Sequence, residues 1–410
     1  MASIPTFGIA LLIPILLWSS VFAYQNSGPK IFNVRDYGAR ANGHSDDSKN
    51  ELNVFNFSLP CQWGFGESKV LVPRGRYMLN SVTFMGPCLG RITFRIEGSL
   101  RGPTSPSQFL NIDTWIGFQF IDGLTLEGGS HGTGGGVLDG QGPSAWKYNT
   151  CNRTSSCPVL PVNLRLDFIT NSTVQNIISI DSKNTHIHLF ACQRLHINHI
   201  RLTAPEGSPN TDGIKIGNST DVKILGAKIE TGDDCIAMVF GSKDIDINQV
   251  QCGPGHGISI GSLGRQSTDQ HVQGITVSNT NFTGTQNGVR IKTWSPSSPS
   301  LASDIVFQYI RMENVNNPIF IDQQYCPYCG FQDDGSRSQV QINNVTYRNI
   351  QGTSSSKVAV SLQCSEVVPC RNVKLEDINL RYNGVGGPAT ASCSHVHGTA
   401  SGEQLPSGCL

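Results

Sequence analysis

Four segments between residues 210 and 292 repeat one short pattern, in which a polar residue is followed by alternating apolar side chains. They read Asp212-Gly-Ile-Lys-Ile, Asp234-Cys-Ile-Ala-Met, His256-Gly-Ile-Ser-Ile and Asn287-Gly-Val-Arg-Ile. Their first residues lie 22, 22 and 31 positions apart. A repeat of about 20–30 residues with period-2 apolar alternation indicates a solenoid, in which each turn adds a short strand to the preceding one.

The repeat places three chemically active side chains at equivalent positions. Asp212, Asp234 and His256 each begin one copy of the pattern. Because neighbouring parallel strands lie about 4.8 Å apart, we expect two carboxylates and an imidazole to form a column on one face of the solenoid. This column is the candidate active site.

Length and charge limit the class of protein. The chain has 410 residues with an unbroken repeat and no Pro/Ser-rich linker, so we expect residues 24–410 to form one elongated domain. Thirty basic and 30 acidic residues give a formal net charge of zero. This balance argues against binding to nucleic acid or to a membrane surface, and any attraction for a charged ligand must be local. We expect the protein to act as a monomer.

The first 23 residues have the pattern of a cleaved signal peptide. An apolar stretch, Ile9–Trp18, precedes Val21-Phe22-Ala23, which has the small-residue spacing of a cleavage site. A membrane anchor is the alternative, although a span needs about 20 apolar residues. Six Asn-x-Ser/Thr sequons fit secretion through a glycosylating compartment. These sequons begin at Asn56, Asn152, Asn171, Asn218, Asn281 and Asn344.

The cysteines predict disulfides. Thirteen cysteines in an exported chain require at least one unpaired thiol. Sequence spacing suggests the pairs Cys61–Cys88, Cys151–Cys157, Cys235–Cys252, Cys326–Cys329, Cys364–Cys370 and Cys393–Cys409. Cys192 is left over, and its apolar neighbours favour a buried, inert thiol. Zinc is the alternative for Cys326-Pro-Tyr-Cys329, but no second Cys/His pair at finger-like spacing accompanies it. No metal or other cofactor is expected.

Two further apolar ladders extend the solenoid. One is predicted to run through Leu195, Val222, Ile245, Ile275, Ile305, Val340 and Val373, and the other through Ile200, Ile229, Val250, Phe282, Val315, Ile350 and Ile378. Together with the Asp/His column they predict an all-β fold of three parallel sheets around stacked Ile, Val and Leu rows. The 44 glycines are expected to form the sharp corners between strands.

Both ends of the solenoid should be covered. At the N-terminal end, a short strand is predicted at Phe32–Gly38 and a capping helix at Asp46–Leu59, which Pro60 would end. The solenoid proper is expected to begin near Val70. The loops after Cys393 are expected to cover the other end, because a solenoid needs polar caps.

The carboxylates can be interpreted as chemistry. Asp212, Asp233 and Asp234 on neighbouring turns would repel one another, so at least one pKa should rise and that group can stay protonated near neutral pH. A protonated carboxyl opposite an ionised one that deprotonates water is what glycoside hydrolysis requires. The alternative for an isolated Asp-Asp pair is a solvated turn. Register with His256 favours the functional interpretation.

Two cations follow one turn beyond His256. In the segment Val289-Arg-Ile-Lys-Thr293, Arg290 and Lys292 share the outward face of the predicted strand. They suit an anionic substrate, because Arg can hold a carboxylate through two parallel hydrogen bonds. The alternative is salt bridges to the aspartates, and both can hold in the empty protein. His256 is expected to orient a carboxylate or to hydrogen-bond a sugar.

Four motifs, taken together, resemble those of a known family. They are Asn210-Thr-Asp212, Gly232-Asp-Asp-Cys235, Gly255-His-Gly-Ile-Ser-Ile-Gly-Ser262 and Arg290-Ile-Lys292. In order and without substitution, they match the signature of the polygalacturonases of glycoside hydrolase family 28, and the similarity extends from about Ile31 to the end. The resemblance implies a right-handed parallel β-helix and inverting hydrolysis of α-1,4 bonds between galacturonic acid units of pectin. It places the protein in the extracellular cell wall.

The resemblance also implies residue roles. Asp233 would be the proton donor, Asp212 and Asp234 would hold the attacking water, and His256 would support them. The substrate-binding residues would be Asn210, Arg290, Lys292 and Tyr325. Inverting glycosidases usually separate their carboxyls by about 6.5–9.5 Å, whereas stacked turns allow less, so spacing alone leaves retention open and the family implies inversion.

The mode of action and three rival functions complete the expectations. The segments Ser208-Pro-Asn-Thr-Asp212, Gly253-Pro-Gly-His256 and Asp322-Gln-Gln-Tyr-Cys-Pro327 are most similar to plant exopolygalacturonases of the pollen type. This similarity implies release of monogalacturonate, and endo cleavage in an open groove is the alternative. The rivals are a calcium-dependent pectin lyase, a non-catalytic wall-binding β-helix, and an inactive relative whose cap is altered at Asn50–Gly66.

Overall fold

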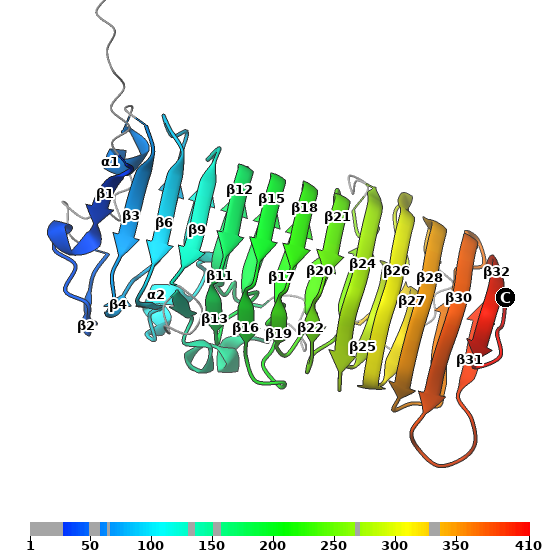
Figure 1. Ribbon diagram of the computed structural model, residues 1–410. Coiled ribbons are helices and arrows are strands. Elements are labelled where there is room, and N and C mark those ends of the chain that lie inside the picture. Colours follow the sequence, from blue (N-terminus) through cyan, green and yellow to red (C-terminus); the bar gives the residue numbers. More distant parts are fainter. Residues whose placement is uncertain are drawn as a thin grey trace, which may run out of the picture.

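The computed structural model describes residues 28–48, 58–63, 66–129, 136–150, 157–266, 271–327 and 337–410. Nearly all its elements are β-strands that pair in parallel with the equivalent strands one turn before and one turn after. Figure 1 shows these turns stacked along one axis, from the blue N-terminal turn to the red C-terminal turn. The structure confirms the predicted all-β parallel β-helix.

One sheet of 11 strands carries the repeat that decides the fold. Its strands are β5 (Val82–Met85), β8 (Thr114–Gln119), β11 (Val162–Asp167), β14 (Ile187–Phe190), β17 (Ile214–Gly217), β20 (Ile236–Met238), β23 (Ile258–Leu263), β25 (Asn287–Trp294), β27 (Asn317–Tyr325), β29 (Val358–Gln363) and β31 (Thr390–Ser394). The predicted strand patterns at residues 214, 236, 258 and 289 lie in four consecutive strands of this sheet.

The second sheet has 21 strands in two rows. The first row contains β1 (Lys30–Asn33), β3 (Ser68–Val72), β6 (Ile92–Ile96), β9 (Leu124–Gly128), β12 (Thr170–Gln175), β15 (Gln193–Asn198), β18 (Thr220–Leu225) and β21 (Lys243–Asn248). The second contains β2 (Asn42–Asp46), β4 (Arg76–Met78), β7 (Ser99–Arg101), β10 (Val137–Asp139), β13 (Ile178–Ile180), β16 (Arg201–Thr203), β19 (Lys228–Glu230) and β22 (Gln251–Cys252).

The two rows merge in the C-terminal half of the solenoid. There β24 (Val272–Thr283), β26 (Ser300–Val315), β28 (Val340–Ser354) and β30 (Cys370–Tyr382) have 12 to 16 residues each and run through both rows, followed by β32 (Val396–Leu405). The prediction of three separate sheets is therefore wrong. Three rows of strands exist, but continuous strands join two of them into one sheet.

The predicted ladders hold in part. The first is confirmed from Leu195 to Ile305, but Ile305 pairs with Val345 and not with Val340. In the second ladder, Ile229 pairs with Leu202 and not Ile200, and Phe282 pairs with Met312 and not Val315. The second ladder therefore mixes side chains of more than two rows, because Val315 pairs with Ser354 after a register shift. The shift of two residues between Ile200 and Leu202 leaves the same face buried, so period-2 alternation does not reveal it.

The corners between the two rows are formed mainly by residues other than glycine. The equivalent corner residues, all with positive φ, are Asn176, His199, Gly226, Gln249, Asn279, Tyr309, Asn349 and Asp377. Only one of them is glycine, so the expectation that glycines form the corners is wrong here. Asn and Asp tolerate the left-handed conformation because their short polar side chains can hydrogen-bond locally.

The core is one continuous cluster of buried side chains from Phe32 to Ala389. Four predicted disulfides are confirmed: Cys61–Cys88, Cys235–Cys252, Cys364–Cys370 and Cys393–Cys409. Cys157 and Cys326 are also disulfide-bonded, and their predicted partners Cys151 and Cys329 lie outside the described residues. Cys192 is free and buried, as predicted. Burial raises the pKa of its thiol to about 11, which makes the thiol unreactive.

The N-terminal elements differ from the prediction. The strand predicted at Phe32–Gly38 ends at Asn33, whose side chain accepts a hydrogen bond from the Arg35 amide and begins the 3-10 helix η1 (Val34–Tyr37). The solenoid begins with β1, which pairs with β3, and therefore starts earlier than Val70.

The predicted capping helix also differs. Most of its range lies outside the described residues, but Asn42–Asp46 is a strand and the helix α1 covers Ser58–Cys61. Pro60 therefore lies inside a helix that it was expected to end, as a first-turn proline can. No helix in the described part of the chain is long and apolar enough to cross a bilayer.

The C-terminal end also differs, because most of the segment after Cys393 forms a strand. β32 pairs with β30 and is largely exposed. Only the final residues fold back, where Leu410 packs against the core and Cys409 is joined to Cys393. The expected covering loops are therefore reduced to a short tail, and the last turn of the solenoid presents a strand to solvent.

Candidate active site

The predicted column exists. Ile214, Ile236 and Ile258 are aligned on β17, β20 and β23, so Asp212, Asp234 and His256, each two residues earlier, begin equivalent turns. In a simple stack His256 would contact Asp234, which occupies the equivalent position one turn earlier, but the structure shows a different partner. The imidazole of His256 hydrogen-bonds to Asp233, which precedes Asp234 in the chain.

Asp234 is buried and fully engaged. Its carboxylate accepts hydrogen bonds from Ser259 Oγ at 2.8 Å, Arg290 Nη2 at 3.1 Å and Lys292 Nζ at 2.8 Å. Burial alone would raise the pKa of this carboxyl, but the Lys292 and Arg290 charges hold it at about 2. In the free protein the two cations therefore form ion pairs with an aspartate, which is the alternative that the sequence left open.

Asp233 is more exposed than Asp234 and faces His256. Its Oδ1 lies 3.0 Å from His256 Nδ1 and accepts the Asp234 amide at 2.8 Å, and its Oδ2 accepts Asn210 Nδ2 at 3.3 Å. The hydrogen bond to Asp233 raises the pKa of His256. His256 therefore contacts the carboxyl of Asp233, the kind of contact through which it was expected to orient a carboxylate.

Asp212 carries the third carboxyl, and it is 9% exposed. Its side chain makes no hydrogen bond to the described residues, although its backbone carbonyl accepts the amide of His186. Burial and the charge of Asp233 raise the pKa of Asp212 to about 7, opposed by Lys215. The site thus combines a carboxyl whose pKa lies near 7 with one that stays ionised, and such a separation of pKa values is what acid/base hydrolysis uses.

The raised pKa of Asp212 predicts a pH-dependent cost to stability. Because its pKa lies above the ordinary value of 3.8, the folded state loses stability as the pH rises from about 4 to 7. We expect Asp212→Asn to raise the free energy of unfolding at pH 7 by on the order of a few kcal/mol, and to change it little at pH 4. Urea unfolding at both pH values, with Asp246→Asn as the exposed control, measures this; equal gains at both would contradict it.

The cations lie beside an aromatic pair. Lys292 Nζ is 5.4 Å from the centre of the Tyr325 ring, which packs edge-on against Trp294 at 5.2 Å. The register between β25 and β27 shifts after Lys292, which pairs with Asp322, so that Trp294 pairs with Tyr325. This irregularity brings Tyr325 next to Lys292, so that two of the predicted substrate-binding residues lie side by side.

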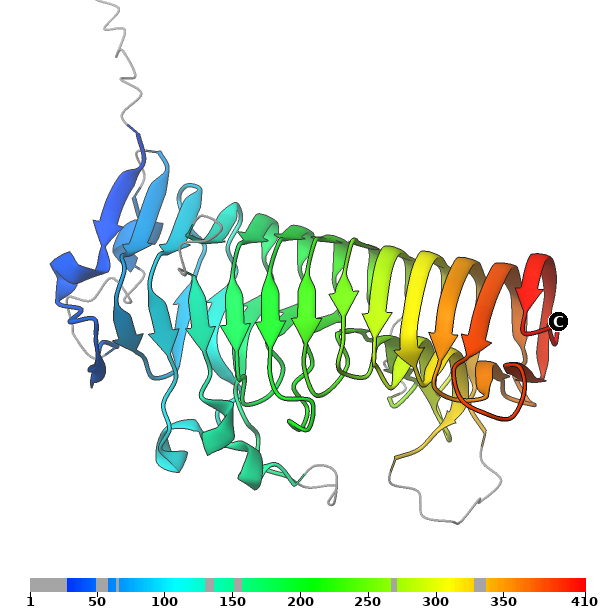
Figure 2. The same cartoon turned by 60° about the horizontal axis from the view of Figure 1, so that its bottom comes forward.

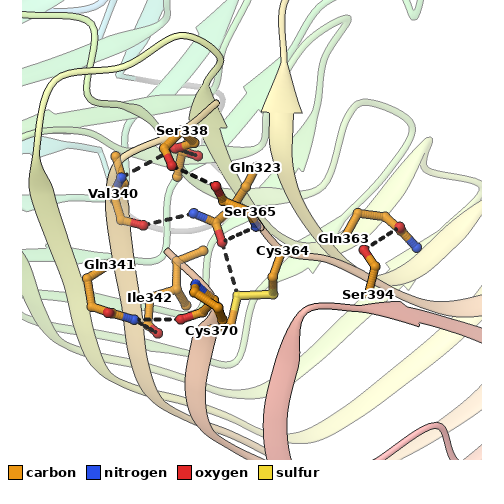
Figure 3. Close-up of a disulfide and its surroundings, with 12 residues drawn as sticks. Gln323, Ser338, Val340, Gln341, Ile342, Gln363, Cys364, Ser365, Cys370 and Ser394 are labelled. Carbon is orange, nitrogen blue, oxygen red and sulfur yellow. Dashed lines mark hydrogen bonds between the residues drawn. A yellow bond between two sulfur atoms is a disulfide. The ribbon is translucent and has the colours of Figure 1, made fainter. Parts of the chain in front are cut away.

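A buried amide fixes the strand that carries Tyr325. Gln323 is 1% exposed; its Nε2 donates to the Val340 carbonyl at 2.8 Å and its Oε1 accepts the Ser365 amide at 3.0 Å. Figure 3 shows Gln323 beside the Cys364–Cys370 disulfide, where its Oε1 lies 3.2 Å from Cys370 Sγ. The end of β27 is therefore anchored from inside, two residues before the tyrosine.

A separate segment rises next to the column on its N-terminal side. The 3-10 turns η2 (Gly142–Ser144) and η3 (Trp146–Tyr148) pack with the helix α2 (Pro106–Phe109) around Phe109, Ala145 and Leu160. Figure 2 shows these helical turns, coloured cyan to teal, projecting from the lower side of the solenoid. Below, the residues 140–149 are called the side wall.

The side wall reaches the site. Trp146 Nε1 donates to the Ser182 carbonyl at 3.0 Å, one turn before Asp212, and Asn149 Nδ2 donates to Asn210 Oδ1 at 3.1 Å. Asn210 in turn donates to Asp233. The predicted residue Asn210 therefore links the side wall to the carboxyl cluster.

A polar cleft of about 460 Å³ opens beside His256. It is lined by Glu206, Gly255, His256, Gly284, Thr285, Gln286, Asn314, Asn316 and Ser355. These residues belong to the His256 turn and the turns that follow it, apart from Glu206. The space for a ligand beside the cluster therefore extends toward the C-terminal end of the solenoid, away from the side wall.

A metal ion would fit poorly. Asp233, Asp234 and His256 offer three ligand atoms within 4.8 Å of one another. However, both oxygens of Asp234 already accept hydrogen bonds from the cationic Arg290 and Lys292. Their charge disfavours a cation at this point, because like charges repel strongly in a buried site.

The structure unites every predicted site residue and adds three that the sequence did not identify. Ser259 bonds both Asp234 and Arg290, Gln323 anchors β27, and Asn149 holds Asn210. Ser259 could have been found, because it occupies the outward position of the predicted strand pattern that begins at His256, one turn before Arg290. Asn149 lies in a segment with no repeat pattern, so no sequence signal pointed to it.

Comparisons with known proteins agree with this geometry. The family described as "Glycosyl hydrolases family 28" matches residues 61–402. An exopolygalacturonase of Platanus acerifolia is 46% identical over 385 residues, covering 93% of this chain and 98% of the relative. One of Oenothera organensis is 45% identical over 345 residues, covering 83% and 92%.

Solved structures share the fold. An endo-xylogalacturonan hydrolase from Aspergillus tubingensis superposes with a TM-score of 0.75 at 22% identity, covering 91% of this chain and 100% of that one. A hyperthermoactive exopolygalacturonase from Thermotoga maritima gives a TM-score of 0.73 at 17% identity, covering 91% and 90%. At these identities the likeness extends to the fold alone.

Proposed function

Since this chain belongs to the Glycosyl hydrolases family 28, we propose that it hydrolyses the α-1,4 bonds between galacturonic acid units of polygalacturonate, with inversion and from the chain end. The observation that carries the proposal is the cluster of three carboxyls, in which Asp233 contacts His256, burial raises the pKa of Asp212 to about 7, and Asp234 is ionised beside two cations. This arrangement supplies an acid, a base and a binding site for a substrate carboxylate.

The roles follow the resemblance and the contacts. Asp233, held by His256, donates a proton to the glycosidic oxygen, while Asp212 and Asp234 hold the attacking water between adjacent turns. In the free protein Asp212 is more buried than Asp233, and its burial raises its pKa to about 7. A sugar bound over the cluster would bury Asp233 as well and place it beside the glycosidic oxygen.

Substrate binding should also free the base. Arg290 and Lys292 are paired with Asp234 in the free protein, and a galacturonate carboxylate at the same place would compete for them. As the cations turn toward the substrate, the pKa of Asp234 rises because their charges are what hold it down. Asp234 then accepts a proton from water more readily.

The side wall supports exo action. It packs on the turn before Asp212 and contacts Asn210, so it limits the groove on that side of the carboxyls. The cations, Tyr325 and the polar cleft lie on the other side, toward the C-terminal turns. A polygalacturonate chain would place one terminal residue against the side wall and extend over the later turns.

Product analysis on polygalacturonate tests the function and its mode. We expect monogalacturonate as the product from the first minutes, with reducing ends released before the viscosity falls appreciably. A steep early fall in viscosity, with few reducing ends and a ladder of oligogalacturonides, would establish endo action. Unsaturated products absorbing at the ultraviolet wavelength of a lyase, or activity lost with a chelator, would establish a calcium-dependent lyase.

We further propose that the protein works outside the cell, in the cell wall, as a monomer. Residues 1–23 would be removed as a signal peptide, which leaves residues 24–410 as the catalytic domain. Its disulfides support this setting, because they persist in oxidising compartments.

A further inference from the structure

We propose that Lys215 binds the carboxylate of the terminal galacturonate, on the opposite side of the scissile bond from Arg290 and Lys292. The proposal rests on the proposed function and on its exo mode. In this proposal Lys215 selects a charged sugar at the end of the polygalacturonate chain, whereas Arg290 and Lys292 bind the sugar on the other side of the scissile bond.

The first argument is the register of the 11-stranded sheet. One outward row contains, in consecutive turns, Arg165, His188, Lys215, Ala237, Ser259 and Arg290. Lys215 therefore lies three turns before Arg290, or about 14 Å along the solenoid at the usual spacing. The two residues between them, Ala237 and Ser259, are small and buried, so no other side chain of this row projects between the two long cationic side chains. The carboxyl cluster lies beside these two small residues.

The second argument is that Lys215 is available. Among the residues that the structure describes, no carboxylate oxygen lies within 4.0 Å of its Nζ, and the side chain is half-buried. Arg165, two turns earlier, is held by Asp113 at 2.7 Å and Asp167 at 2.8 Å. Between them, His188 is neutral, because burial lowers its pKa to about 4. Lys215 is the unpaired positive charge of this row.

The third argument is the position of the side wall. Its contacts with Ser182 and Asn210 lie on the turn before Asp212 and at the start of the Asp212 turn. A terminal sugar between the side wall and the carboxyls would therefore lie over the β17 turn, which carries Lys215. Each galacturonate bears one carboxylate, and a charge-assisted hydrogen bond to a partly buried ammonium is among the strong polar contacts.

The experiment compares Lys215→Met with a matched control, Lys223→Met. Lys223 lies in the same turn but on β18 of the other sheet, where it is exposed. The substrates are trigalacturonate and a trigalacturonate methyl-esterified only on the residue that is released. For the charged substrate we expect Lys215→Met to lower kcat/KM by about 10- to 100-fold. On the esterified substrate, Lys215→Met should have the same kcat/KM as the wild type. Lys215→Arg should recover most of the kcat/KM that Lys215→Met loses on the charged substrate.

The alternatives give different results. Equal losses on both substrates would overturn the proposal, because Lys215 would then act only through its charge on Asp212, and the pH profile of kcat/KM would shift on both. No loss on either substrate would also overturn it. Product analysis of the wild-type enzyme tests the exo mode independently of the Lys215 variants. If the mode is endo, the wild-type enzyme releases oligogalacturonides from polygalacturonate.

Discussion

Replacing Asp233 with asparagine is expected to lower kcat by at least about 10²–10⁴-fold, with little change in KM. Asparagine keeps the shape of the side chain and can still bond to Asn210 and His256, but it cannot donate a proton to the leaving group. Initial rates on polygalacturonate give kcat and KM, and calorimetry with an unreactive oligogalacturonide should show retained binding. Asp246→Asn, exposed on β21, is the control.

A substrate with a good leaving group separates the acid from the residues that hold water. Such a substrate needs less protonation, so it should partly rescue Asp233→Asn and should not rescue Asp212→Asn or Asp234→Asn. The test matters because burial raises the pKa of Asp212 to about 7 in the free protein, which makes Asp212 a second candidate for the acid. Rescue of Asp212→Asn instead would make Asp212 the acid, and near-normal kcat in Asp233→Asn would remove the cluster as the catalytic site.

Replacing Arg290 or Lys292 with alanine is expected to raise KM for polygalacturonate by about 10- to 150-fold. Each change removes a charge-assisted contact to the substrate carboxylate, worth about 1.5–3 kcal/mol. It also leaves the buried Asp234 with one cation fewer, so the pKa of Asp234 should rise from about 2 and the pH profile should change. Steady-state kinetics between pH 4 and 7 measure both effects.

The control for these variants is chemical as well as structural. On highly methyl-esterified pectin the two cations have few carboxylates to bind, so the variants should resemble the wild type much more closely. Arg311→Ala, exposed on β26, should behave as the wild type on both substrates. Equal losses on charged and esterified chains would show that Arg290 and Lys292 do not recognise the carboxylate.

The repeat alone was enough to predict the column, because a strict period fixes which residues share a position on adjacent turns. It could not predict which carboxyl His256 contacts, since Asp233 and Asp234 are sequence neighbours whose side chains point to different partners. The ladder error at Val340 has a different origin: Val340 lies five residues before Val345, the partner of Ile305, and the left-handed residue Asn344 interrupts the alternation between them.

Features without a period were not predictable from the repeat. The side wall depends on contacts such as Trp146 to Ser182, which are 36 residues apart and carry no repeat signal. The corners were predicted from the glycine count, although most use a left-handed Asn or another residue, as at Asn279 and Asn349. Local side-chain hydrogen bonds decide those positions, and composition does not report them.

The ion pairs of Asp234 have a consequence for the order of reactions on pectin. In the free enzyme this carboxylate occupies the cations that a galacturonate would use, so it acts as an internal mimic of the substrate. A neutral methyl ester cannot displace Asp234 from Arg290 and Lys292. Asp234 then stays ion-paired and cannot act as the base. We therefore expect the enzyme to act much more slowly on esterified than on free polygalacturonate, so that a reaction that hydrolyses methyl esters would have to come before chain shortening.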